Sequence, residues 1–167
     1  MDCANYEKNW ACPPLPFDAG EYLKTFPYVY IIAVKTAYDD DTVKSLKGQE
    51  ANAFVWDIFQ KMKNRLLELL YALELNYPGI GVSAGRCEVC ERCSRLEGIS
   101  CGYPDKMRHS FESFGFDMSK ISEDLFSLPI KWATGGLPPY HTFVNAFFAK
   151  SADEAILQDI RAFEFRL

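Results

Sequence analysis

Four cysteines near the middle of the chain have the residue type and the spacing of a metal-binding loop. Cys87, Cys90, Cys93 and Cys101 follow the pattern C-x2-C-x2-C-x7-C. Cysteine thiolates are soft ligands, which bind iron–sulfur clusters and zinc. We therefore predict that these four side chains bind one inorganic centre.

The spacing favours a [4Fe-4S] cluster over zinc. A structural zinc site usually takes its ligands from two C-x2-C pairs that are well separated in sequence. Here the third cysteine lies only three residues after the second, at the same spacing as the first pair. Three sulfurs can therefore surround a cube in which each binds a different iron. Pro104, shortly after Cys101, resembles the proline of the bacterial ferredoxin run, although that run has a shorter last gap. Zinc is the alternative.

The chain has two further cysteines, Cys3 and Cys12. Pro13 and Pro14 follow the second of them and keep the backbone extended there. The pair could form a second metal site with ligands upstream of Met1, lie near the first centre, or consist of buried thiols. All three readings stay open.

The two histidines, His109 and His141, are interpreted as core or surface side chains rather than ligands. His109 follows the cysteine loop closely enough to be tested as a ligand. The sequence offers no serine–histidine–acid triad, phosphate-binding loop or pair of catalytic carboxylates. Whether the protein is an enzyme therefore stays undecided, with a role other than catalysis preferred.

The elements before the cysteines are predicted from hydrophobic periodicity. Residues 28–37 are apolar on both faces, which indicates a strand buried on both sides. Residues 45–75 carry apolar side chains at intervals of three and four, which predicts a long core helix that ends at Asn76-Tyr77-Pro78-Gly79. Residues 80–84 then form a short strand that leads to Cys87. Such a strand, helix and returning strand should give a right-handed parallel pair.

Five elements are predicted after the cysteines. They are a helix from Pro104 to Phe114, a helix capped by Asp117, a pair of strands at residues 129–134 and 142–148, and a carboxy-terminal helix within 151–167 that begins with a Ser151-x2-Glu154 capping box. The amino end of the first helix would favour an anionic centre at Cys101. The predicted fold is α+β in one domain, 1–167: a mixed sheet, a long helix packed on it, a cysteine-rich metal loop, and a cysteine- and proline-rich loop at residues 1–20.

The composition and charge of the chain argue against some classes of binding partner. The net charge is −5, with no long run of one sign, which argues against nucleic acid and anionic membranes. No apolar run approaches the ~20 residues that span a bilayer, and the amino terminus lacks a secretory signal pattern. Six cysteines are too few for a disulfide scaffold. A cytoplasmic protein is expected.

Several motifs together resemble one known family. Tyr6-x3-Trp10-x-Cys12-Pro13-Pro14, the four-cysteine motif, and Pro104-Asp105-Lys106-Met107-Arg108-His109-Ser110-x-Glu112 before Gly115-Phe116-Asp117 are similar to the uncharacterised "predicted metal-binding protein" family, domain of unknown function 2284. Its members are common in anaerobic bacteria and methanogenic archaea. The resemblance implies that Cys87, Cys90, Cys93 and Cys101 bind the metal and that Cys3 and Cys12 match an amino-terminal cysteine motif. Members also carry a cysteine ahead of the position of Cys3, and often a proline at that of His109.

Three functions follow as hypotheses. The first is a [4Fe-4S] protein that transfers electrons, senses or delivers a cluster for a redox or accessory partner protein. The second is a zinc-stabilised interaction module. The third is an iron–sulfur enzyme with an open iron, which uses Cys12 or His109 at its substrate.

Overall fold

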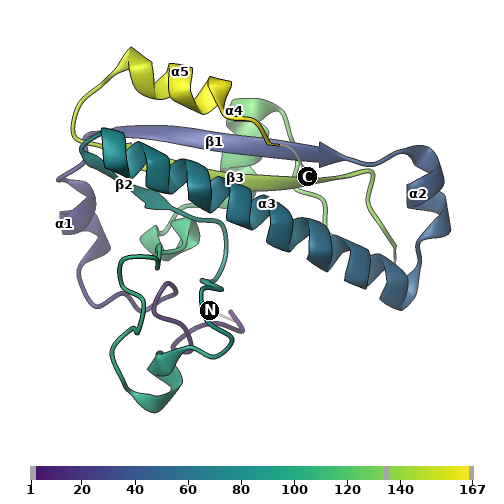
Figure 1. The fold of residues 1–167 in the computed structure, drawn as a ribbon, viewed down its shortest axis with the longest axis horizontal. Coiled ribbons are helices and arrows are strands. Elements are labelled where there is room, and N and C mark those ends of the chain that lie inside the picture. Colours follow the sequence, from purple (N-terminus) through teal and green to yellow (C-terminus); the bar gives the residue numbers. More distant parts are fainter. Residues whose placement is uncertain (1–2, 134–135, 166–167) are drawn as a thin grey trace.

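The computed structural model of this chain describes residues 3–133 and 136–165. Its sheet has three strands in the order β1-β3-β2, namely Tyr28–Ala37, Tyr140–Ala149 and Gly79–Val82 (Figure 1). The central strand, β3, is antiparallel to both neighbours. With its helices the molecule has the predicted α+β fold.

The predicted parallel pair is wrong in one respect. The strands β1 and β2 do run in the same direction, but β3 lies between them. Phe143 to Ala149 are all buried, so the most apolar strand takes the central position. In consequence β1 lies at an edge, and only Ile32 of it is fully buried. The prediction of a strand buried on both sides is therefore also wrong.

Helices cover both faces of the sheet. In chain order they are α1 (Ala19–Leu23), α2 (Asp40–Ser45), α3 (Gly48–Asn76), the 3-10 helices η1 (Ser94–Glu97) and η2 (Phe111–Phe114), α4 (Met118–Phe126) and α5 (Glu154–Ala162). The predicted long helix corresponds to α3, which runs along one face of the sheet (Figure 1).

Side chains on alternate positions of the strands build two cores. The first core joins α3 to β3 through Leu66, Leu70, Leu73 and Phe147, and Ile156 of α5 packs there as well. The second core lies on the opposite face, where Phe111, Phe114 and Met118 pack against Val144 and Phe148. This two-sided burial follows from the period of two along a strand.

The helix predicted from Pro104 to Phe114 is absent in these described residues, which form a turn and the short η2. Backbone groups that would form hydrogen bonds within such a helix instead bond to residues far away in the sequence. The carbonyl of Lys106 accepts a hydrogen bond from Tyr71, and the amide of Ser110 donates to Ala11. The predicted anion-favouring helix start beside Cys101 is therefore wrong.

The elements after residue 115 agree with the prediction only in part. Asp117 caps α4 as predicted, and Leu125 of this helix is exposed. The described residues of the predicted strand at 129–134 form no strand, and Thr134 lies outside the described residues. The carboxy-terminal helix is present, but its cap is Asp153 rather than Ser151.

No helix formed by residues 3–133 and 136–165 combines the length and the apolar character needed to cross a membrane.

Candidate metal centre

The cysteine loop, residues 84–109, is closed at its base by backbone hydrogen bonds. The amide of Ser83 donates to the carbonyl of His109, and the amide of Phe111 donates to the carbonyl of Ser83, both at 3.0 Å. The amide of Ser110 also donates to Ala11 at 2.8 Å. The exit of β2, the end of the loop and the amino-terminal segment are thus joined at one place.

Glycines fit this base of the loop in two ways. The backbone of Gly85 has φ +63°, a left-handed conformation that favours glycine, so the chain can turn tightly there at the start of the loop. Gly81 has a different role. A Cβ added to it would lie 2.8 Å from the Cβ of Leu70, so its lack of a side chain lets β2 approach α3.

Polar side chains of α3 hold the loop along its length. The ammonium of Lys63 donates to the carbonyls of Ala84, at 2.9 Å, and Arg86. On the same helix, Gln60 donates to Glu88, Tyr71 donates to the carbonyl of Lys106, and Glu74 accepts from Arg108. At 3.6 residues per turn these four helix positions share one face. The helix therefore packs its apolar side chains into the core and uses a neighbouring row of polar side chains to bind the loop.

The amino-terminal segment, residues 9–14, lies on the cysteine loop (Figure 1). Asn9 donates to the carbonyl of Cys87 at 3.0 Å, and the Trp10 ring nitrogen donates to that of Ile99. The guanidinium of Arg95 donates to the carbonyls of Asn9, Cys12 and Pro14 and lies 5.0 Å from the Trp10 ring centre. One arginine thus fixes the segment by three carbonyls and a cation–π contact.

One hydrogen bond from this segment reaches a predicted ligand directly. The backbone amide of Trp10 points at the sulfur of Cys93, at 3.5 Å. An amide donor favours the negatively charged form of the sulfur, and such bonds tune metal–thiolate centres. Nothing in the spacing of the cysteines pointed to this contact.

The four predicted ligands lie in one neighbourhood. Burial raises the pKa of the Cys87 thiol, and the nearby Cys90 and Cys101 raise it further. Burial also raises the pKa of Cys90, with Cys93 and Cys101 adding to the effect. As the side chains stand, no three of the described histidine, cysteine, aspartate and glutamate residues converge closely enough to hold one metal ion.

A cavity of about 830 Å³ borders the cysteine loop. Cys87, Cys90 and Cys93 line it together with Asn9 and Trp56. The fit of the donor set to a metal centre is therefore chemical: clustered thiols, an amide directed at one sulfur, and open volume beside three of them.

Cys3 and Cys12 differ from these four cysteines, which are half-buried, in exposure. The first is exposed and the second is buried, with 3% of its surface accessible. Burial, with smaller contributions from Cys3 and Glu112, raises the pKa of Cys12 to about 11. At neutral pH Cys12 is thus a protonated core side chain, and Cys3 is near enough to influence it.

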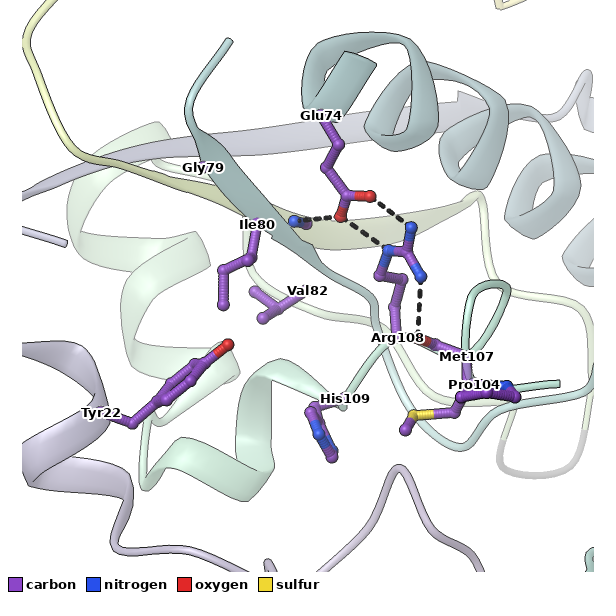
Figure 2. A pocket seen from close by; sticks show the side chains of 10 residues that line it. Tyr22, Glu74, Gly79, Ile80, Val82, Pro104, Met107, Arg108 and His109 are labelled. Atoms are coloured by element: carbon purple, nitrogen blue, oxygen red, sulfur yellow. Dashed lines mark hydrogen bonds and ion pairs between the residues drawn. The ribbon is translucent and has the colours of Figure 1, made fainter. Parts of the chain in front are cut away.

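The histidines occupy different places. His109 packs edge-on against Phe17 and Phe114, and burial lowers its pKa. It also lines a smaller pocket of about 260 Å³ beside β2, where Tyr22 and His109 lie across from the Glu74–Arg108 ion pair (Figure 2). The other histidine, His141, pairs its ring nitrogen with the Tyr38 hydroxyl at 2.8 Å.

The comparisons with known proteins give one match. The family model described as "Predicted metal-binding protein (DUF2284)" matches residues 1–144. No curated protein and no solved structure matches the chain. The match covers the amino-terminal segment, the cysteine loop and the helix that anchors it. This chain therefore belongs to the family of predicted metal-binding proteins.

Proposed function

We propose that this protein carries a [4Fe-4S] cluster on Cys87, Cys90, Cys93 and Cys101 and uses it to exchange electrons with a partner protein. The observation that carries the proposal is the four-cysteine motif on a single loop, because three ligands at this spacing suit a cube of several irons. When bound, such a cluster supplies a one-electron couple whose potential depends on burial and on hydrogen bonds to sulfur.

The surroundings of the loop support exchange with a partner. Leu96, Ile99 and Tyr103 lie on the loop and are half or more exposed, at 50%, 57% and 51%. Exposed apolar side chains beside a redox centre suit a transient protein–protein contact. The cytoplasm, where thiols remain reduced and available as ligands, is the proposed location.

The first experiment is metal and sulfide analysis of protein purified without oxygen. The proposal expects a brown protein with about four iron and four sulfide per chain. Reversible reduction and reoxidation without loss of iron supports electron transfer, whereas passage of the cluster to a metal-free acceptor indicates cluster delivery. A colourless protein with stoichiometric zinc refutes the iron–sulfur proposal and favours the interaction module.

The ligand set is tested by a pair of variants. Cys101→Ser should abolish the intact cluster, because it removes one of four thiolates. Cys12→Ser is the matched control, since it changes a buried cysteine outside the proposed set and should keep the iron content. Circular dichroism verifies that both variants fold. Unchanged iron in Cys101→Ser would remove Cys101 from the ligands, and loss of iron in Cys12→Ser would add Cys12 to them.

A further inference from the structure

Lys63 is a buried charge with an unusual set of partners. It lies on α3 with 4% of its surface accessible. Its ammonium donates hydrogen bonds to the backbone carbonyls of Ala84 and Arg86, both of which are neutral. Among the carboxylates of residues 3–133 and 136–165, none forms an ion pair with it.

A buried ammonium in this position is costly. Removing a charge from water costs several kcal/mol unless an opposite charge compensates it. Glu88, the carboxylate that acts most strongly on the Lys63 charge, already accepts hydrogen bonds from Gln60 and Arg86. Burial lowers the pKa of Lys63, and the carboxylates of Glu88 and Glu112 oppose this effect. The described protein thus compensates this charge only in part.

The position of the Lys63 ammonium indicates which negative group balances its charge. Lys63 binds the two carbonyls that flank Gly85, directly before Cys87. Four thiolates bound to zinc or to an iron–sulfur core carry a net negative charge. A metal centre at the cysteine loop therefore places an anion beside the buried cation.

We propose that Lys63 is the fixed countercharge of the metal centre and a positioning residue for the segment that leads into Cys87. The inference rests on the proposed metal site, but not on the identity of the metal. Its ammonium stabilises the loaded, anionic centre. For a cluster it also favours the reduced form, which is more negative by one electron, and so raises the reduction potential.

The test compares three variants with the wild type. Lys63→Met removes the charge and the hydrogen bonds, whereas Lys63→Gln keeps a hydrogen-bond donor and removes only the charge. Lys61→Met is the matched control, because it removes the same charge from an exposed position on the same helix, where Lys61 pairs with Asp57. Each protein is studied metal-free and loaded, by chemical unfolding and by a potentiometric titration of the loaded form.

The expected result is a different effect on the stability of the metal-free and of the loaded protein. Loss of the Lys63 charge should leave the metal-free protein as stable as the wild type or more stable, since an uncompensated buried cation disappears. The same change should destabilise the loaded protein. Both Lys63 variants should also lower the midpoint potential of a cluster, and Lys61→Met should change neither quantity.

Two results overturn the inference. If Lys63→Met destabilises the metal-free and loaded proteins equally, the residue has only a structural role. If Lys63→Gln keeps the wild-type potential and the wild-type stability of the loaded form, the hydrogen bonds matter and the charge does not. Zinc in the wild-type protein would refute electron transfer, yet the comparison of metal-free and loaded stability would still test Lys63.

Discussion

Cys12 shows how strongly the surroundings of one thiol decide its chemistry. It is buried, and its pKa is raised to about 11, mainly by burial. In the metal-free protein Cys12 is therefore a neutral thiol at neutral pH and packs as an apolar core residue. This neutral state has a consequence for the pH dependence of stability.

We predict that Cys12 destabilises the metal-free fold at alkaline pH. Its pKa is near 9.0 without burial and about 11 in the folded protein. Because the folded pKa is the higher one, the stabilisation of the fold by the neutral Cys12 thiol is fully present below about pH 9. It is lost as the pH rises to about 11. Two pKa units correspond to about 2 to 3 kcal/mol at most.

The measurement is urea unfolding of the wild type and of Cys12→Ala between about pH 8 and pH 11. Other thiols, tyrosines and lysines titrate in both proteins, so only the difference between the two reports on Cys12. The stability advantage of the wild type should shrink across this window. A difference that stays constant with pH would show that Cys12 keeps an ordinary pKa.

At the residue scale, the sequence allowed the cysteines to be selected but not the groups around them. The cysteines stand out because their spacing is regular. Asn9 and Arg95 instead act on backbone carbonyls that lie 78 to 86 residues away in the chain, and such contacts leave no local pattern. Lys63 and Glu74 could have been suspected, since with Gln60 and Tyr71 they form a polar stripe beside the apolar stripe of α3.

At the scale of elements, the amino-terminal segment depends on Arg95. Its guanidinium binds three carbonyls of residues 9–14 and contacts the Trp10 ring. The segment has no regular secondary structure beyond turns, and its other backbone bonds to the cysteine loop and its base include those of Trp10 to the Cys93 sulfur and of Ser110 to the Ala11 carbonyl. Because Arg95 binds three of its carbonyls, the order of the segment should be sensitive to this side chain.

We predict that Arg95→Gln releases the segment from the cysteine loop. Trypsin should then cut after Lys8, which is exposed, several times faster than in the wild type, because cleavage follows local opening. Mass spectrometry of the early fragments identifies the cut. Arg92→Gln is the control, since the one ion pair of Arg92 within residues 3–133 and 136–165 is an exposed contact with Glu97 at 3.6 Å. Equal cleavage of both variants would contradict the role of Arg95.

Periodicity predicted the elements that are long and amphipathic, and it failed where the chain makes long-range contacts. The helix α3 and the strand β1 have enough apolar positions to be recognised from sequence. The order of the strands depends on which strand is buried most deeply, and β3 is separated from its partners by long segments. The turn at Tyr103 replaces a helix because Tyr71 and Ala11 take its backbone groups.

At the scale of the molecule, the cysteine loop and the sheet are held together by different forces. Both apolar cores are built from the strands and the helices around them, and within the described residues neither contains a residue of the loop. The loop is fixed by hydrogen bonds from α3, by the Glu74–Arg108 ion pair and by the amino-terminal segment. A metal centre would add to these bonds without being required by the core.

We therefore predict that removal of the metal loosens the loop and leaves the sheet intact. Amide hydrogen exchange of the metal-free protein should increase in residues 84–109 and 9–14, because the thiolates then repel one another or become protonated and no longer hold the loop. Exchange in β1, β3 and α3 should change little, since their protection comes from apolar burial. The far-UV circular dichroism should remain close to that of the loaded protein. Loss of protection throughout the sheet would instead mean that the metal is part of the folding unit, as in a zinc finger.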